Sequence, residues 1–337
     1  MQPFNPLKNP DWDVLLTRRP DFSFFHGAAW AGVLEATYGF TPVWLAADNS
    51  LLPLMEVDSW LTGRRGIALP FTDECRPLCE TRDDFQRLFQ NAVEFGRSRG
   101  WKSIELRGGR KFLSEAPASL SFYGHSLNLA ADESRLFGQM GGSARQAVRK
   151  AEKAGVRVEV LQSEAAVRDF YALQCRTRKR HGLPPQPFSF FLNLWRQILS
   201  QNQGVVVLAS AHGEKIAGAV YFFLGGRAIY KYGASDFRRQ HLRPNNLVMW
   251  TAMKWLARNG VTTLHLGKTS LANEGLRRFK LNLGADEQRI EYVKFDLQAN
   301  RFVTETDRIV GWHNRVFRAL PVCLSRLAGK LLYKHWA

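Results

Sequence analysis

The chain has 337 residues, of which 45% are hydrophobic and 23% charged, so its composition is that of a folded globular protein and excludes a disordered chain. This length is enough for one large domain or for two domains of about 150 residues each. The formal net charge of +17 favours an anionic partner such as nucleic acid, anionic lipid or a phosphorylated metabolite.

The positive charge is confined to the second part of the chain. Residues 1–140 contain 15 Lys and Arg against 17 Asp and Glu, and residues 141–337 contain 32 against 13, so the two parts carry −2 and +19. The cysteines have neither metal-site spacing nor the density of a disulfide scaffold, so we expect reduced thiols at Cys75, Cys79, Cys175 and Cys323. The N-terminus carries acidic residues and prolines instead of a leader, and no apolar stretch approaches the ~18 residues of a membrane span. These features predict a cytoplasmic protein, either soluble or peripheral at the inner face of the membrane.

Two stretches predict the same succession of elements. Residues 42–57 read as two apolar strands joined by an Asp-Asn-Ser turn, and residues 204–235 read as three strands, the first two joined by a His-Gly-Glu turn. Each stretch is followed by a helix that ends at a glycine, Gly100 or Gly260, and then by a strand. Because the two helix–strand segments align without a gap, we infer a duplicated unit and two similar α/β domains.

Residues 141–160 predict a basic connecting helix. Arg145, Arg149 and Lys153 recur every four residues and therefore share one face. This face is either a solvated surface or a ridge that contacts phosphate. The scarcity of acidic partners favours the phosphate interpretation.

Residues 164–203 predict two helices around a basic, proline-rich connection at 177–187. This connection is either a lid over a substrate groove or a plain surface loop. In the tail, residues 308–337 contain no acidic residue, while leucines and other apolar residues recur every three or four positions, with Pro321 as a kink. Such a basic amphipathic tail either packs on its own domain or lies on an anionic membrane.

The sequence therefore predicts four segments. They are an N-terminal α/β domain, a basic connecting helix, a C-terminal α/β domain and a basic amphipathic tail, at residues 1–140, 141–160, 161–300 and 301–337.

Two kinds of chemistry are not supported by the sequence. The eight histidines are scattered and form no metal-binding motif, so we predict no metal site. Nucleophilic catalysis lacks a Gly-x-Ser-x-Gly elbow, and Cys175 lies in an amphipathic helical stretch where a buried thiol is expected. No dinucleotide or phosphate-loop fingerprint is present.

Several spaced motifs in residues 20–292 resemble the FemAB-like branch of the GNAT acyltransferase superfamily. They include "SARQAVRKAEKAGVRV", "TRKRHGLPPQP", "YKYGAS" and "LHLGKTSLANEGLRRFKLNLGA", and in the first half "DFSFFHGAAWAGVLEATYGFTPVWLAA" and "LPFTDECRPL". The resemblance implies an α/β fold of two tandem GNAT-like domains. It also implies transfer of an acyl or aminoacyl group to an amine, with aminoacyl-tRNA or acyl-CoA as donor and no tightly bound cofactor.

The chain departs from the family in two respects. The long helical arm of some bridge-forming members has no room in this chain. The glycine-rich pyrophosphate loop of acetyl-CoA enzymes is also missing, because "DFRRQHLRPNN" precedes the helix at Asn246 to Arg258. A helix N-terminus there can still bind phosphate, although Pro244 removes one amide.

The family's Phe-Lys motif falls on Phe279 and Lys280, and the resemblance implies that Lys280 binds donor phosphate or stabilises charge during transfer. An amine attacking an ester or thioester needs a held acceptor and positive groups near the developing oxyanion, but no covalent intermediate. Further candidates that contact substrate are Asn273, Lys268, Tyr232, Arg145, Arg149 and Arg178. The candidate bases are Asp73 and Asp236, with substrate-assisted proton transfer as the alternative.

Three functions remain open from the sequence. The first is an aminoacyltransferase acting on a cell-envelope precursor such as that of peptidoglycan, with a lipid-linked or nucleotide-linked acceptor. The second is an acyl-CoA-dependent N-acyltransferase acting on an amino sugar or polysaccharide intermediate. The third is a noncatalytic RNA-binding module, since the charge of the second half would bind RNA by itself.

Overall fold

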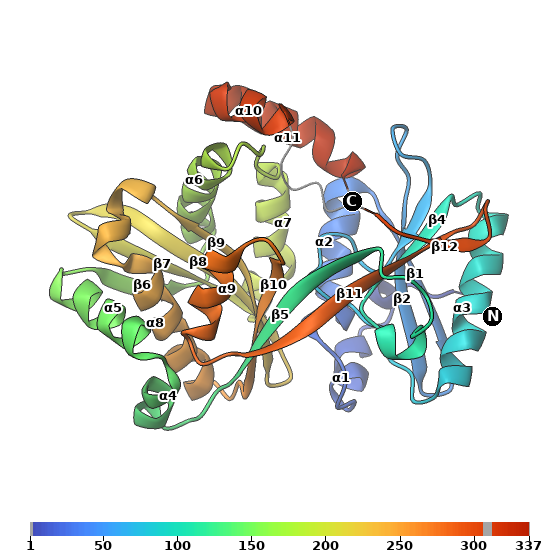
Figure 1. The fold of residues 1–337 in the computed structure, drawn as a ribbon, viewed down its shortest axis with the longest axis horizontal. Helices are drawn as coiled ribbons and strands as arrows, with labels where there is room; N and C mark the ends of the chain where they lie inside the picture. The colour runs from blue at the N-terminus through green and yellow to red at the C-terminus, as the bar shows by residue number, and fades with distance from the viewer. Residues whose placement is uncertain (1–2, 306–311, 337) are drawn as a thin grey trace. The chain divides into compact units, whose positions relative to one another are not determined.

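The computed structural model describes residues 3–305 and 312–336. Its contacts divide the chain into two compact units (Figure 1). Unit 1 comprises Met1–Tyr123, Arg289–Arg308 and Leu332–Ala337, and unit 2 comprises Gly124–Gln288 and Ile309–Leu331. Arg308 and Ile309, which belong to the predicted tail, lie outside the described residues.

Unit 1 is a mixed sheet covered by helices. Its strand order is β1-β2-β3-β4-β11, with β12 paired to β11. The strands are β1 (Thr41–Ala47), β2 (Ser50–Val57), β3 (Arg65–Ile67), β4 (Ser103–Arg107), the second part of β11 (Asp286–Asp296) and β12 (Arg301–Val303). The helices are α1 (Trp12–Thr17), α2 (Ala28–Tyr38) and α3 (Arg82–Ser98), with short 3-10 turns at η1 (Pro6–Lys8), η2 (Phe24–His26), η3 (Arg110–Phe112) and η6 (Tyr333–His335).

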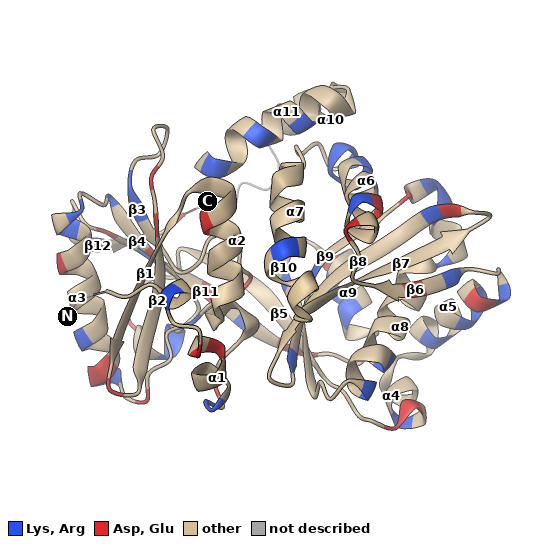
Figure 2. Cartoon of the chain, turned by 180° about the vertical axis from the view of Figure 1, so that it is seen from behind, with Lys and Arg blue, Asp and Glu red and all other residues tan. Residues whose placement is uncertain are grey.

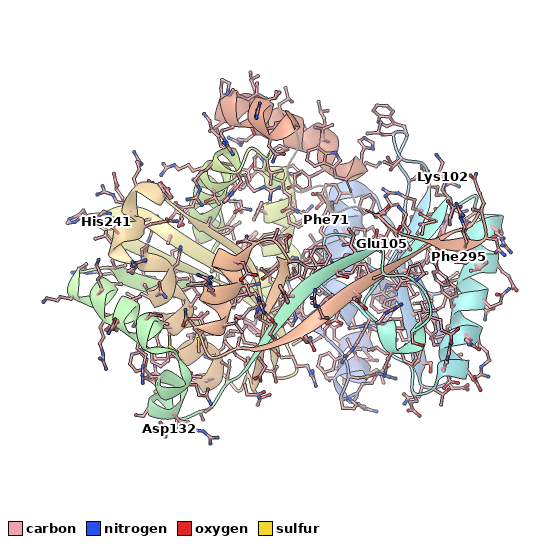
Figure 3. All side chains as sticks on the ribbon, in the orientation of Figure 1. Phe71, Lys102, Glu105, Asp132, His241 and Phe295 are labelled. Carbon is pink, nitrogen blue, oxygen red and sulfur yellow. The ribbon has the colours of Figure 1, made fainter. Side chains whose placement is uncertain are left out.

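The core of unit 1 lies where α3 packs on β1, β2 and β4. The hydrophobic face of α3 buries Phe85 and Leu88 against the sheet. Phe295 of β11, labelled in Figure 3, packs edge-on against Phe89 and Phe302. Aromatic pairs of this kind add to the free energy gained by burying their area.

Unit 2 has the strand order β5-β10-β9-β8-β7-β6. Its strands are the second part of β5 (Leu120–Asn128), β6 (Arg157–Leu161), β7 (Gly204–Ala211), β8 (Glu214–Leu224), β9 (Arg227–Ser235) and β10 (Thr263–Ser270). Its helices are α4 (Glu133–Gln139), α5 (Gly142–Lys153), α6 (Glu164–Arg180), α7 (Phe188–Gln197), α8 (Pro244–Arg258), α9 (Glu274–Leu281), α10 (Trp312–Ala319) and α11 (Val322–Leu332), with 3-10 turns η4 (Leu199–Gln201) and η5 (Phe237–Leu242).

Side chains of the unit 2 sheet point alternately to its two faces, and each face is covered by helices. Val205, Val207 and Ala209 join the core cluster that includes α5 and α8. On β8, a Cβ at Gly218 would meet Phe170 of α6 at 3.2 Å, so α6 packs closely on the sheet. Successive strand residues point to opposite faces, which explains how one strand serves two layers of helices.

The local predictions from sequence are confirmed. The hairpin at 42–57 is the antiparallel pair β1–β2, and residues 204–235 form the antiparallel series β7–β8–β9. Both predicted helix ends are left-handed glycines, with φ of +70° at Gly100 and +79° at Gly260. Only glycine adopts this conformation without strain, so it ends both helices at equivalent points.

The compact units do not follow the linear boundaries expected from sequence. β11 pairs antiparallel with β4, from Tyr292↔Arg107 to Asp296↔Ser103, and this pairing returns residues 289–308 to unit 1. The division also falls at residue 123, within β5, instead of after residue 140. Strand pairing between residues so far apart in sequence leaves no local signal.

Candidate functional site

The strands β9 and β10 of unit 2 are parallel, and both become irregular shortly after they pair. Their register covers three residue pairs, from Thr263↔Arg227 to His265↔Ile229. The register of β9 with β8 then shifts at Val220/Tyr221, which leaves Lys231 as an extra residue. In β10, Gly267 has φ of +72°. A bulge and a left-handed residue redirect side chains and end regular pairing, and both are frequent beside functional sites.

Lys280 of α9 is held against this irregular part of β10. Its side chain is only 3% exposed. Its Nζ donates to the carbonyl oxygens of Gly267 at 2.9 Å and Lys268 at 3.2 Å, and to Thr269 Oγ1 at 2.8 Å. An ammonium has three hydrogens, so these three bonds engage it fully. In this conformation Lys280 joins α9 to β10.

A second buried polar group lies in the same unit, on β5. His125 is inaccessible to solvent, and its Nε2 lies 3.0 Å from Glu287 Oε2. Arg277 of α9 donates to both oxygens of Glu287 at 2.8 Å. Burial and the nearby Lys280 charge lower the pKa of His125, so this histidine is neutral at neutral pH. Sequence reasoning missed His125 and Glu287, which are 162 residues apart and belong to no motif.

A cavity of about 360 Å³ opens at the N-terminus of α8. Two cations line it, Lys150 of α5 and Arg243, together with Ser143, Ala144, Gln146, Ala147, Asn246, Phe279 and Asn282. Arg243 precedes the helix with φ of +58°, a strained conformation for a residue with a side chain. Pro244 occupies the first helical position, where its missing N–H costs least.

This cavity suits an anionic group. The positive end of the α8 dipole and two cationic side chains converge on it from two segments of the chain, α5 and the start of α8. The N-terminus of α8 thus lies beside two cations without a glycine-rich loop, and phosphate binding there stays a prediction. Lys150 and Arg243 were not among the residues predicted to contact substrate.

The predicted phosphate contacts lie elsewhere in unit 2. Arg145 and Arg149 are on α5 but not among the residues that line the cavity, and the Arg149 guanidinium lies 5.7 Å from the Phe137 ring centre. Arg178 Nε donates to the carbonyl oxygen of Pro184 at 3.2 Å, which holds the proline-rich connection. The face of α5 that lines the cavity includes residues 143, 146, 147 and 150. Which cations reach the cavity therefore depends on the face of the helix to which each side chain belongs.

The predicted groove residues have separate local roles. Asn273 caps α9, with its Oδ1 accepting from the Leu276 amide at 3.1 Å. Tyr232 packs against Phe191 at 5.6 Å between ring centres. Phe279 lines the cavity, while Lys268 contributes its carbonyl oxygen to Lys280. Phe279 therefore belongs to the same helix as Lys280, and Lys268 belongs to the strand that Lys280 contacts.

The two candidate bases differ in their surroundings. Asp236 accepts from Arg238, whose Nη2 lies 2.6 Å from Oδ2, and these contacts lower the Asp236 pKa to about 2. A carboxylate held so firmly in its charged form is a weak base. Asp73 belongs to unit 1, where its carbonyl oxygen accepts from Tyr292 Oη at 2.8 Å. Neither carboxylate lines the cavity at α8.

In the part of the chain that the structure describes, no group of three or more His, Cys, Asp or Glu could hold a metal ion. Burial raises the pKa of the Cys175 thiol, which disfavours the nucleophilic thiolate. The search of the described helices for a span that is long and apolar enough to cross a membrane found none.

Unit 1 also has a cavity, of about 710 Å³, and it contains a neutralised ion pair. Arg99 donates to both carboxylate oxygens of Glu56, at 3.0 and 2.8 Å, and Trp101 Nε1 donates to the same group at 2.6 Å. Burial opposes ionisation of Glu56, but these bonds outweigh it and lower the Glu56 pKa. Arg99 and Glu56 therefore neutralise each other, and Lys8 is the further cation of the lining.

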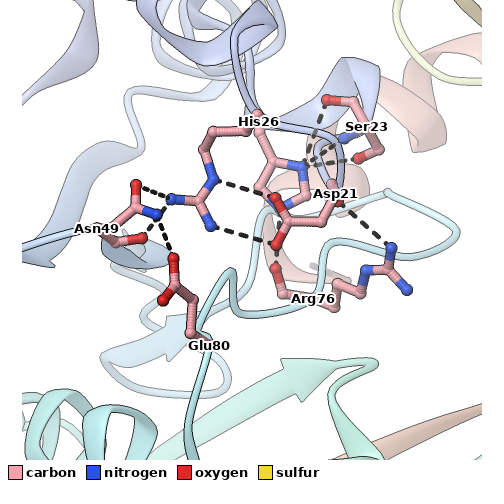
Figure 4. Close-up of polar contacts among 7 residues, drawn as sticks. Asp21, Ser23, His26, Asn49, Arg76 and Glu80 are labelled. Atoms are coloured by element: carbon pink, nitrogen blue, oxygen red, sulfur yellow. Dashed lines mark hydrogen bonds and ion pairs between the residues drawn. The ribbon is translucent and has the colours of Figure 1, made fainter.

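A second polar network of unit 1 is structural (Figure 4). The ring of His26 is fully buried, with Nε2 donating to the Arg76 carbonyl oxygen at 2.8 Å and Nδ1 accepting from the Ser23 amide at 2.9 Å. Arg19 bridges Asp21 and Asn49. Burial lowers the His26 pKa to about 4, so its neutral form joins these loops.

The fold is that of proteins with tandem GNAT-like α/β domains. Residues 140–287 match the family model of the acetyltransferase (GNAT) domain, so this segment is a GNAT domain. The predicted resemblance to the FemAB-like branch and the predicted fold class are confirmed.

Solved structures share the fold at low sequence identity. FemX is 15% identical with a TM-score of 0.67, over 83% of this chain and 94% of that chain. The C-terminal domain of an assigned lysylphosphatidylglycerol synthetase from Agrobacterium fabrum is 15% identical with a TM-score of 0.55, over 83% and 90%. A tandem GNAT protein of the clavulanic acid biosynthesis pathway is 10% identical with a TM-score of 0.53, over 88% and 98%. No curated protein matches the chain.

Proposed function

We propose that the chain transfers an aminoacyl or acyl group to the amine of a cell-envelope precursor, and that unit 2 carries out the transfer. The observation that carries this proposal is the cavity at the N-terminus of α8, where Lys150 and Arg243 supply positive charge. The donor binds there through its phosphates. Both aminoacyl-tRNA and acyl-CoA carry phosphates, so the cavity suits the donor class.

The transfer proceeds by direct attack. The acceptor nitrogen bonds to the carbonyl carbon of the donor, and the bond from that carbon to the ribose oxygen or the thiol sulfur breaks. The amine proton passes to the departing oxygen or sulfur, so no enzyme-bound intermediate forms. Lys280 stabilises the negative charge that develops on the carbonyl oxygen, acting through its charge and through the segment of β10 that it holds.

Aminoacyl-tRNA is the donor that we favour. The cation excess of residues 141–337 gives a polyanion many contacts beyond the cavity itself. The wider surface includes Arg145 and Arg149, which lie on α5 outside the cavity lining. FemX and the lysylphosphatidylglycerol synthetase domain share the fold, and the name of the second describes aminoacylation of a membrane lipid.

The second candidate function is acyl-CoA-dependent N-acylation of an amino sugar or polysaccharide intermediate. The family match at residues 140–287 favours it, because GNAT domains use acyl-CoA as co-substrate. The noncatalytic RNA-binding alternative is set aside, because the GNAT domain makes the chain an acyltransferase.

Transfer assays with both donors test the proposal. The purified chain is incubated with a soluble muropeptide amine and either radiolabelled aminoacyl-tRNA or radiolabelled acetyl-CoA. Label in the muropeptide from aminoacyl-tRNA, lost in Lys280→Met, supports the first function. Label from acetyl-CoA alone moves the assignment to the second function. No incorporation from either donor contradicts the proposal.

A further inference from the structure

Helix α11 has its polarity reversed relative to an ordinary surface helix. It packs on unit 2 through small and polar residues, since Ser325 and Gly329 are buried. Its leucines instead face solvent, with Leu324, Leu327 and Leu331 exposed to 49%, 54% and 62%. Val316 of α10 is exposed to 47%. An apolar stripe that points away from the core indicates a surface that meets another apolar phase.

Close backbone contact fixes this orientation. A Cβ at Gly329 would lie 1.9 Å from the carbonyl oxygen of Pro185, so only glycine lets α11 approach the proline-rich connection. In the same connection, a Cβ at Gly182 would clash with the carbonyl oxygen of Asn314 in α10. Rotation of α11 to bury its leucines would bring larger side chains against this backbone, which leaves no space for them.

The two helices carry only positive charge. Residues 308–337 contain no Asp or Glu, and Figure 2 shows blue segments without red ones on α10 and α11. Arg315, Arg318, Arg326 and Lys330 are all exposed. A helix with an outward apolar stripe and flanking cations has the composition of an interfacial helix on an anionic bilayer.

A groove of about 410 Å³ lies beside α11, along one face of α6. Its walls are apolar side chains and its rim has three arginines, and its residues are Arg168, Tyr171, Ala172, Cys175, Arg176, Phe188, Val322 and Arg326. The Arg326 guanidinium lies 5.3 Å from the Tyr171 ring centre, and that of Arg168 lies 4.9 Å from the Phe188 ring centre. Arg168 also pairs with Glu164, and Arg176 lies 3.8 Å from Asp236, so Arg326 is the rim cation that we assign to a phosphate headgroup. The apolar walls beside it match the start of an acyl chain.

We propose that α10 and α11 dock unit 2 onto an anionic lipid bilayer, with the outward leucines of α11 in the acyl boundary and one lipid phosphate at the arginine rim of the α6–α11 groove. Charge complementarity selects this occupant, because a neutral protein partner would need no such cation excess. Hydrophobic insertion and a polybasic patch are two separate signals, which together give stable peripheral binding. This docking is independent of the transfer reaction proposed for unit 2.

Flotation with vesicles tests the docking surface. We expect the full chain to bind phosphatidylglycerol vesicles and not phosphatidylcholine vesicles at moderate salt. Leu327→Asp should weaken binding at least about tenfold, because it places a charge in the stripe. The matched control is Val14→Asp, which changes an equally exposed apolar residue of α1 in unit 1 and should leave vesicle binding unchanged.

Loss of one rim cation tests the groove. Arg326→Ala should weaken binding to anionic vesicles by about fivefold. The control Arg157→Ala removes an exposed cation of β6, an edge strand of the unit 2 sheet that does not line the groove. It should weaken vesicle binding less. Equal losses in the two variants would overturn the groove assignment, since they would mean that only total charge matters.

A fluorescent probe reports on the face itself. Cys323 is exposed on α11, and Cys75, Cys79 and Cys175 are buried, so a polarity-sensitive thiol dye labels Cys323 selectively. We expect its emission to shift to shorter wavelength with anionic vesicles. An unchanged spectrum alongside vesicle binding would overturn the docking face. Dimerisation without lipid that Leu327→Asp abolishes would overturn the bilayer in favour of a second copy of the chain.

Discussion

The two units differ in how they use a buried cation. In unit 1, Arg107 at the end of β4 donates to Glu105 of the same strand at 2.7 Å and to the carbonyl oxygen of Leu69 at 3.3 Å. In unit 2 the equivalent strand is β10, and Lys280 of α9 donates to its residues Gly267, Lys268 and Thr269. Arg107 therefore shares its charge with a carboxylate inside one strand, whereas Lys280 ties a helix to an irregular strand end.

The cavities of the units differ in the same way. The larger one, in unit 1, contains the Glu56–Arg99 pair, whose charges satisfy each other. The smaller one, in unit 2, is lined by Lys150 and Arg243 and by no acidic residue. Size alone would select the unit 1 cavity as the site. We favour the unit 2 cavity as the anion site, because Glu56 neutralises one of the cations that line the unit 1 cavity, whereas the lining of the unit 2 cavity contains no acidic residue.

The largest expected effect comes from replacing the two buried cations. Lys280→Met should lower kcat on the order of a hundredfold, because the charge that stabilises the developing oxyanion is lost. Arg107→Met should instead cost about 3 kcal/mol of stability, since it removes a buried guanidinium that pairs with Glu105 and donates to the Leu69 carbonyl oxygen. Transfer assays and urea unfolding on both variants measure the contrast.

The turnover of each variant is divided by its folded fraction, so that a loss of stability is not mistaken for a loss of catalysis. Arg107→Met should retain turnover once corrected for its folded fraction. If Arg107→Met and Lys280→Met lose turnover equally, the functional difference between the units disappears.

A pH-dependent loss of stability is expected from unit 1. The His26 pKa is about 4 in the folded state, below its ordinary value of 6.5. The unfolded chain therefore takes up this proton first, so stability that is complete above about pH 6.5 falls as the pH approaches 4, by about 3 kcal/mol in total. Urea unfolding across this range measures the loss.

Two variants assign that loss to one side chain. His26→Gln removes this titrating group and should reduce the pH dependence, while the smaller contributions of His125 and His181, whose pKa values are also lowered by burial, remain. His241→Gln, which changes an exposed histidine, should leave the profile of the parent chain. A profile unchanged in His26→Gln would contradict the assignment.

Charge reversal in the cavity should have a moderate effect. Lys150→Glu should weaken donor binding about tenfold, since it places a negative charge beside the donor phosphates. Arg149→Glu changes the same charge on the preceding residue of α5, which lies outside the cavity lining, and it should weaken binding of CoA, a donor too small to need the wider surface, by less. Titration calorimetry with the donor compares them, and an equal effect would mean that α5 acts only through its overall charge.

The smallest expected effect concerns the helix caps of the two units. Asn273→Ala removes the cap of α9, and Thr81→Ala removes that of α3, where Thr81 Oγ1 accepts from the Asp84 amide. Each should cost about 1 kcal/mol of stability. Only Asn273→Ala should also lower turnover, because α9 carries Lys280, and melting temperatures beside transfer rates would show this.

Much of the fold could be predicted from local patterns. Strand–turn–strand runs and the glycines at positions 100 and 260 identify hairpins and helix ends, because these depend on neighbouring residues alone. The return of β11 to β4 could not be predicted, since it depends on pairing across nearly the whole chain.

The site was predicted less completely. The Phe-Lys pair was found by resemblance, but the cavity cations Lys150 and Arg243 were missed, because a shift of one residue along α5 changes the face that a side chain occupies. For α11, the leucine period was visible in the sequence, yet its outward direction depends on the contact between Gly329 and Pro185.

Hydrogen–deuterium exchange with and without saturating donor tests the central claim most directly. Parallel samples contain aminoacyl-tRNA or CoA, and amide exchange is followed in peptides of both units. We expect protection in residues 142–150 and 243–247 of unit 2, with no change in residues 41–43 and 95–99 that border the unit 1 cavity. Protection confined to the unit 1 segments would contradict the account.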